Sequence, residues 1–117
     1  MAKYERRLTG DMDALLDAIY RGIIKGSRSS SFEDESDFHI GDARCSVRVF
    51  ERYSALGGNR LSLSVTVLGA GNDLQLSAIT AGGGSSGTIG MMLKENTAGE
   101  GPFLNKLIKI VENFISQ

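Results

Sequence analysis

The chain has 117 residues and nearly balanced charge, with thirteen Lys and Arg against fourteen Asp and Glu and a formal net charge of -1. This balance excludes the strong overall field that draws basic proteins to nucleic acid or to anionic membranes. The apolar fraction of 41% excludes a disordered chain, and the single cysteine excludes an intramolecular disulfide. The length is near the commonest domain size, so we expect one domain over residues 1–117.

The sequence carries no feature that would direct it to a membrane or out of the cell. Met1 to Leu8 is charged and no apolar segment follows it, unlike a signal peptide. No apolar run approaches the roughly 18 residues that span a bilayer. The lone Cys45 is typical of a reducing compartment. We therefore expect a soluble, cytoplasmic protein with no membrane partner.

The predicted elements begin with a short strand over Lys3 to Leu8 and a helix over residues 12–25. Thr9 or Asp11 is placed to cap this helix, and Gly26 is a natural stop. An apolar stripe at helical spacing supports the helix and comprises Met12, Leu15, Leu16, Ile19 and Ile23.

The next segment is polar, and its structure is ambiguous from the sequence. Residues 29–32 could begin a strand, whereas the acidic residues 33–37 form either an exposed strand or a loop. If they pair with residues 43–53 around a turn near Ile40, they lie close to two arginines and opposite charges pair across the strands. Binding of a hard cation is the alternative, but the EF-hand spacing is missing and no metal site is predicted. The residues concerned are Glu33, Asp34, Glu35, Asp37, Arg44 and Arg48.

Three strands with clear alternation follow, starting near Ala43, Leu61 and Leu74. Short glycine-bearing links predict antiparallel hairpins, because parallel strands need a long crossover. Residues 89–93 form either a further edge strand or an ordered loop. A last helix is expected over residues 102–116, with proline at its first position. Its apolar stripe comprises Phe103, Leu104, Leu107, Ile108, Val111, Phe114 and Ile115.

The resulting order, β-α-β-β-β-β-(β)-α, predicts an α+β fold. Each helix has one apolar stripe and each central strand has one apolar face. The simplest arrangement is therefore a curved antiparallel sheet of about five strands with both helices on one face. This element order resembles the TATA-binding-protein-like and helix-grip architectures. The likeness concerns element order only and implies no function.

Two candidate sites near the middle of the chain are interpreted as structural. Cys45 and His39 could act as nucleophile and base, but Cys45 is expected in the core and His39 in a turn. Arg44, Arg48 and Arg52 share a strand face with one aromatic residue, a pattern that can bind single-stranded nucleic acid. Nearby acids favour an ion-paired face instead. We therefore predict no catalytic residue, no cofactor and no nucleic-acid partner.

A glycine- and serine-rich segment is the candidate ligand-binding loop. Its backbone N–H groups could cradle a phosphate, with Lys94 or Arg60 nearby. The Walker pattern needs Lys followed by Ser or Thr after its last glycine, whereas Thr88 follows the last glycine directly. A flexible connection is the preferred interpretation. An enzyme or phosphate-ligand binder remains the alternative function, and its loop residues are Gly82, Gly83, Gly84, Ser85, Ser86 and Gly87.

The sheet face turned away from the helices is the candidate interface. If the helices cover residues such as Val47 and Val65, alternation places short polar side chains on this face. Between residues 61 and 81 the only charge is Asp73, so another surface can approach closely. We therefore expect a non-enzymatic binding or interaction domain that self-associates as a symmetric dimer, an ordinary solvated face being the alternative. The expected interface residues are Ser46, Arg48, Ser62, Ser64, Thr66, Gln75 and Ser77.

Several segments of the chain are similar to a known family. They are residues 44–54 (RCSVRVFERYS), 56–60 (LGGNR), 1–11 (MAKYERRLTGD) and 77–83 (SAITAGG). Together they resemble a family of small bacterial proteins that share a domain of unknown function, over nearly the whole chain. The resemblance implies a bacterial cytoplasmic setting and no activity, ligand or catalytic residue.

Overall fold

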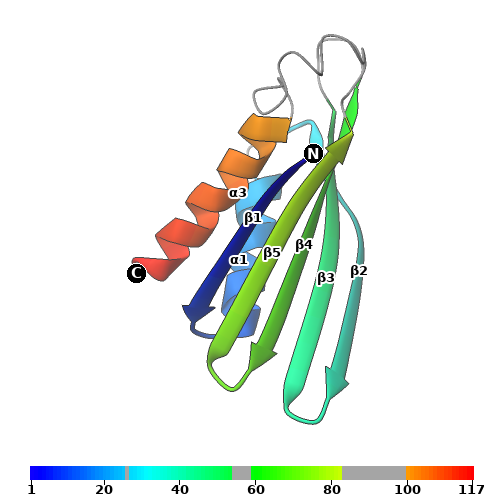
Figure 1. The fold of residues 1–117 in the computed structure, drawn as a ribbon. Coiled ribbons are helices and arrows are strands. Elements are labelled where there is room, and N and C mark those ends of the chain that lie inside the picture. The colour runs from blue at the N-terminus through cyan, green and yellow to red at the C-terminus, as the bar shows by residue number, and fades with distance from the viewer. Residues whose placement is uncertain (26, 54–58, 83–99) are drawn as a thin grey trace.

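A computed structural model describes residues 1–25, 27–53, 59–82 and 100–117 of the chain. Two helices pack on one face of a five-stranded sheet (Figure 1). All neighbouring strands are antiparallel, and their order across the sheet is β1-β5-β4-β3-β2. The elements are β1 (Ala2–Thr9), α1 (Met12–Ile24), β2 (Ser30–Ile40), β3 (Ala43–Tyr53), β4 (Arg60–Ala70), β5 (Asp73–Gly82) and α3 (Glu100–Ile115).

The predicted α+β fold with its five-stranded antiparallel sheet is confirmed. The ambiguous acidic segment is a strand, β2, which pairs with β3 as the charge pattern suggested. The predicted stop at Gly26 and the strand or loop at residues 89–93 lie outside the described residues. The likeness to the TATA-binding-protein-like or helix-grip architectures stays a prediction.

The first helix begins with the cap that its sequence predicts. Asp11 has an extended backbone, and its side chain accepts a hydrogen bond from the backbone N–H of Ala14 at 2.8 Å. Asp13 in the first turn and Arg21 in the last turn suit the two ends of the helix dipole. The helix buries one stripe against the sheet and α3, made of Leu15, Leu16, Ile19 and Ile23.

The last helix starts two residues earlier than predicted, at Glu100. Pro102 is therefore inside the first turn, where an N–H group has no intrahelical partner and its absence breaks no bond. The stripe predicted for this helix packs into the core, and its most buried members are Phe103, Leu104, Leu107 and Val111.

Edge strand β1 is fastened to α3 by one ion-paired cluster. The Tyr4 hydroxyl donates a hydrogen bond to Glu112 Oε2 at 2.5 Å, and Arg6 Nε donates to the same oxygen at 2.8 Å. Burial and then the hydrogen bond to Glu112 raise the pKa of Tyr4 to about 12. The hydrogen bond from Arg6 lowers the pKa of the Glu112 carboxyl. These contacts join residues more than 100 positions apart in the sequence.

Two hairpins end in two-residue loops that require glycine. The loops are Gly41-Asp42 between β2 and β3 and Gly71-Asn72 between β4 and β5. The two glycines have φ of 58° and 61°, the left-handed backbone needed at the first position of a type II′ hairpin turn. Such tight loops fix the strand registers that place every side chain on one sheet face or the other.

The core lies between the sheet and the helices. The residues of β3 that point into it are those that the sequence pattern had predicted on the opposite face of the sheet. Phe50 is fully buried and pairs with Leu63, which is also buried. Ser46 and Arg48 therefore point toward the helices, whereas Val47 points away from them. The prediction that the helices cover Val47 was wrong, because burying Phe50 decides the orientation of the whole strand.

The close approach of α1 and α3 predicts a specific response to mutation. A Cβ atom at Gly22 would lie 2.4 Å from Ile110 Cδ1 of α3. We expect Gly22→Val to lower the free energy of unfolding by about 1–3 kcal/mol, as overpacking does. The penalty should shrink when Ile110→Ala is added, and a double-mutant cycle from urea denaturation measures this coupling. Equal penalties in both backgrounds would contradict the contact.

Candidate functional site

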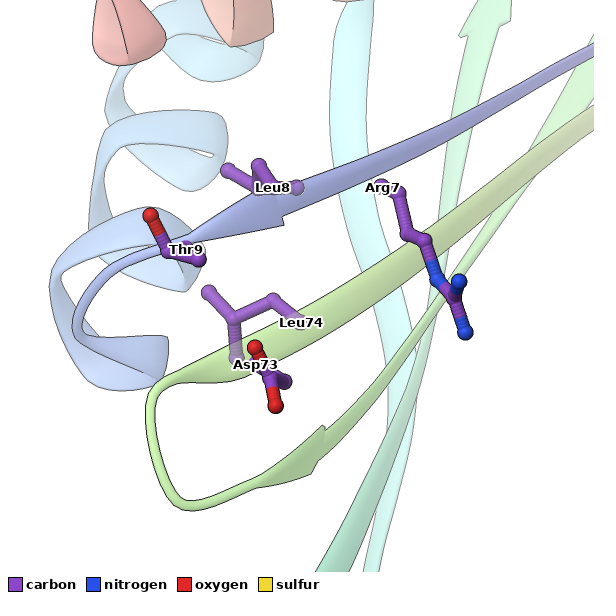
Figure 2. A pocket seen from close by; sticks show the side chains of 5 residues that line it. All are labelled: Arg7, Leu8, Thr9, Asp73 and Leu74. Carbon is purple, nitrogen blue, oxygen red and sulfur yellow. The ribbon is translucent and has the colours of Figure 1, made fainter.

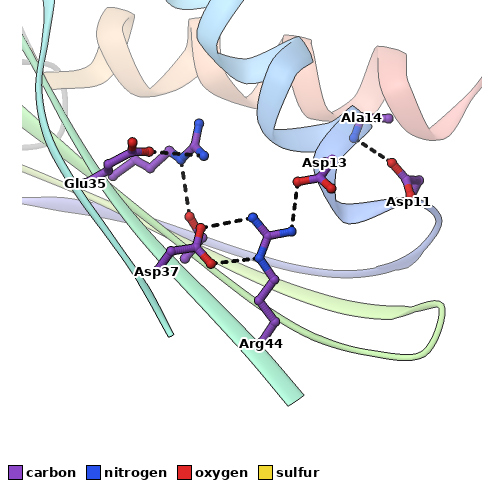
Figure 3. A network of polar contacts seen from close by, with 8 residues as sticks. Asp11, Asp13, Ala14, Glu35, Asp37 and Arg44 are labelled. Atoms are coloured by element: carbon purple, nitrogen blue, oxygen red, sulfur yellow. Dashed lines mark hydrogen bonds and ion pairs between the residues drawn. The ribbon is translucent and has the colours of Figure 1, made fainter. Parts of the chain in front are cut away.

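A polar network joins the β2–β3 hairpin to α1 on the helix side of the sheet (Figure 3). Arg44 donates from Nε and Nη2 to the two carboxylate oxygens of Asp37, at 2.8 Å and 3.0 Å. Its Nη1 reaches Asp13 Oδ1 on α1 at 2.8 Å. The hydrogen bonds from Arg44 lower the pKa of the Asp37 carboxyl, and those to Asp37 and then Asp13 raise the pKa of Arg44. The network thus links the sheet to α1 through one arginine that binds two carboxylates.

The second arginine of β3 extends the same network. Arg48 lies 3.2 Å from Glu35 and donates to Ser46 Oγ, also at 3.2 Å. The predicted pairing of β2 acids with Arg44 and Arg48 is therefore confirmed. Among the described residues, no group of three or more His, Cys, Asp or Glu side chains could hold a metal ion.

Two residues proposed for the interface lie on the other side of the sheet. Ser46 is completely buried under the helices, and Arg48 is ion-paired there. Their predicted place on the exposed face was wrong for the reason given above, the burial of Phe50. Arg52 shares this inner face and lies over the ring of Phe103, 5.5 Å from its centroid. The three arginines of β3 are thus engaged by acids and an aromatic ring on the helix side.

We define the open face as the sheet face opposite the helices. Neither of the described helices covers it. The other five predicted interface residues do lie on this face, because they alternate with buried residues of β4 and β5. Their role in an interface stays a prediction. They are Ser62, Ser64, Thr66, Gln75 and Ser77.

The open face also carries apolar side chains that the sequence interpretation did not place there. Phe38, Cys45 and Leu68 are consecutive partners across β2, β3 and β4, and we call them the apolar row. Phe38 is 51% exposed, Leu68 is 49% exposed, and Cys45 is partly exposed. Ile40, next to the row at the end of β2, is 83% exposed. The alternation of Phe38 and Ile40 with polar neighbours was the available signal.

The predicted burial of Cys45 in the core was therefore wrong. The thiol shares the open face with Leu68, whereas His39 pairs with Arg44 on the opposite face. His39 is a strand residue and not the turn residue that was expected. A nucleophile and a base on opposite sides of one sheet cannot exchange a proton directly.

Charges on the open face lie near its margins. Lys3, Glu5 and Arg7 alternate along edge strand β1, and Lys3 lies 3.8 Å from Glu5. Asp34 occupies the opposite edge, on β2. At the end of the face remote from the apolar row, Arg60 of β4 pairs with Glu51 of β3.

Residues in the described part of the chain line two pockets that lie away from the open face or at its edge. One, of about 370 Å³, is lined by Arg7, Leu8, Thr9, Asp73 and Leu74 at the end of β1 (Figure 2). The other, of about 470 Å³, lies between α1 and α3 and includes Asp17, Arg21 and Lys25. In the first, the Arg7 and Asp73 side chains diverge rather than converging on a common point (Figure 2).

The candidate glycine loop is described at one residue only. Gly82 closes β5 with φ of 98°, and a Cβ there would lie 2.7 Å from the carbonyl oxygen of Arg60. Glycine at this position serves the close approach of two strands. The remaining residues, Gly83, Gly84, Ser85, Ser86 and Gly87, lie outside the described residues, and their phosphate-binding role stays a prediction.

Comparison with known proteins agrees with the resemblance found in the sequence. A family model described as a family of unknown function, DUF6054, matches residues 1–115. The chain belongs to this family. A search of curated proteins found no match to the chain. Among the helices of the described residues, none is long and apolar enough to cross a membrane. Membership in DUF6054 assigns no activity to the chain.

The ion pair between Arg44 and Asp37 predicts a loss of stability in acid. The folded-state pKa of Asp37 is lowered, so its stabilising contribution is complete above the unfolded value, about 3.9, and is lost as the pH falls through the folded value. We expect the free energy of unfolding in urea to fall as the pH drops below about 5, and to keep falling until the pH has passed the lowered folded-state pKa of Asp37. Asp37→Asn should lower stability at neutral pH and flatten this dependence.

Asp17→Asn is the matched control for this prediction. Asp17 pairs with Arg21 on the exposed side of α1, and both side chains are more than half exposed. Exposed helix pairs contribute little, so this variant should keep the pH dependence of the wild type. An unaltered acid profile in Asp37→Asn would show that the inner pair contributes nothing measurable.

Proposed function

We propose that the chain is a non-enzymatic binding domain that self-associates through its open face. The observation that carries this proposal is the apolar row, where Phe38 and Leu68 remain about half exposed beside the more exposed Ile40. Single exposed apolar residues are common, but large ones gathered on one face mark interaction sites. The row extends into Val47 and Val49, which are half-buried on the same face of β3.

The dimensions of the open face suit a stable dimer. Five strands spaced about 4.8 Å apart, each about 30 Å long, give a face of roughly 700 Å². Stable interfaces of standard size bury about 800 Å² on each partner. A second copy seated on this face would therefore cover enough surface to hold without help from another part of the chain.

The polar part of the open face also favours close approach. Its centre carries the short side chains of Ser64, Thr66 and Ser77. On β3, β4 and β5 the charged residues of this face stand only at strand ends. A sheet face exposed to solvent usually carries Lys and Glu along its length, which oppose association with other surfaces. Short hydroxyl side chains can instead hydrogen-bond across an interface, directly or through water.

Among the described residues, the titratable groups with shifted pKa values are better explained by a structural role than by a catalytic one. Tyr4, Arg6 and Glu112 fasten β1 to α3, while Asp37 and Arg44 fasten the β2–β3 hairpin to α1. Catalytic acids and bases are tuned toward the working pH, whereas the carboxyl pKa values here are pushed further from neutrality. Hydrogen-bonded ion pairs between layers are the first cause of the shifts of the carboxyl and arginine groups, and burial is the first cause of the raised Tyr4 pKa.

Ser64→Arg should weaken self-association. Ser64 lies on β4, the middle strand of the sheet, so a long charged side chain there would be forced into the centre of the interface. We expect sedimentation velocity to show a dimer at micromolar concentration for the wild type and a monomer for Ser64→Arg. Ser116→Arg is the control, because this exposed serine follows α3 and leaves the open face unchanged.

The native thiol offers a second measurement of the same interface. Cys45 is part of the apolar row, so dimer formation should slow its reaction with a thiol reagent. We expect labelling to be faster in dilute protein and in Ser64→Arg than in concentrated wild type. A wild type that stays monomeric at high micromolar concentration would refute the proposed function.

A further inference from the structure

We infer that the two copies pair about a two-fold axis parallel to β4, so that edge strand β1 of each copy lies over edge strand β2 of the other. This inference rests on the proposed function and specifies the partner and its orientation. The contact that distinguishes this orientation is an ion pair, at the edges of the face, between Lys3 and Asp34 of the partner. It is drawn from the order of residues across the open face, which strand register determines.

Two rows of the open face carry the argument. The residues of the apolar row continue across β5 and β1, and the full row reads Phe38, Cys45, Leu68, Gln75 and Arg7. A second row lies four residues along each strand from the apolar row. It reads Asp34, Val49, Ser64, Ile79 and Lys3.

An axis parallel to the middle strand keeps each row in place and reverses its direction. Leu68 then meets Leu68 of the partner, and Val49 meets the partner's Ile79. At the edges, Asp34 meets the partner's Lys3, and Phe38 meets the partner's Arg7, a cation over an aromatic ring. Within these two rows, each charged residue thus faces an opposite charge or an aromatic ring, and Leu68, Val49 and Ile79 face apolar residues.

An axis across the strands gives a much poorer match. It would exchange the two rows, placing Arg7 over the partner's Lys3 and Phe38 over the partner's Asp34. Like charges facing each other across an interface are strongly unfavourable. Both axes leave the strands of the two sheets aligned. The charges of these two rows therefore select the axis parallel to β4.

When two sheets pack in this orientation, Lys3 can still reach Asp34 of the partner. Aligned sheets cross at about 30°, which displaces the outer strands along each other by about 5 Å. A lysine side chain spans this displacement. Lys3 is well exposed, and within the described part of the chain its acidic partner is Glu5 on its own strand, at 3.8 Å. Asp34 is exposed on β2.

A charge-swap experiment, in which Lys3 and Asp34 are reversed in two separate variants, tests this orientation of the dimer. Lys3→Asp homodimers and Asp34→Lys homodimers each oppose like charges at two symmetry-related sites. We expect each variant to dimerise about tenfold more weakly than the wild type, because two weak rim pairs are lost together. A mixture of the two variants should form heterodimers with wild-type affinity, because both ion pairs are then restored.

Native mass spectrometry of the mixture measures the fraction of heterodimer. Lys109→Asp, an exposed charge reversal on α3, replaces Lys3→Asp in the control mixture and should give no preference for heterodimers. Rescue in the mixture cannot come from contacts within one chain, such as the one between Lys3 and Glu5. If the wild type dimerises but the mixture shows no preference, the inferred orientation is wrong and self-association stands. If the wild type is monomeric, the proposed function itself is refuted.

Discussion

The burial of Phe50 is the constraint on which the rest of the structure depends. Its ring is inaccessible and packs 5.3 Å from the ring of Phe32, which in turn meets Tyr20 of α1 edge-on. Because side chains alternate along a strand, this one inward ring turns the arginines of β3 toward the helices. The same alternation leaves Cys45, Val47 and Val49 on the open face. Both the inner network and the outer apolar row follow from one aromatic residue.

The inner network has a further role in holding β2. This strand is an edge strand rich in acids, and on its own it would be a poor partner for an apolar core. Arg44 and Arg48 supply charge partners from the neighbouring strand, and Asp13 extends the contact to α1. The acids therefore stabilise the hairpin while also discouraging further strands from joining this edge. The open face, which lacks such charges at its centre, is left as the surface suited to association.

The parts of the fold that the sequence predicts best are those with an unambiguous pattern. α1 and α3 each have one apolar stripe, and β4 alternates serine or threonine with leucine or valine without exception from Leu61 to Val67. The interface candidates on β4 and β5 were accordingly placed on the correct face. β3 has apolar residues on both faces, so its local pattern favours the face with Val47 and Val49. Only the contacts of Phe50 with distant residues decide otherwise, and no local pattern contains that information.

The pairing of β1 with β5 has a consequence for how the chain folds. The other four strands form a meander of hairpins whose partners are close in sequence, whereas the contact between Ala2 and Thr80 spans 78 residues. Closing a loop of this length costs more entropy than closing a hairpin, and long-range pairings of this kind slow folding. During synthesis the first strand to leave the ribosome has no partner until the fifth has emerged. We therefore expect β1 to join the sheet after the β2–β5 meander has formed, with its charged side chains exposed to solvent until then.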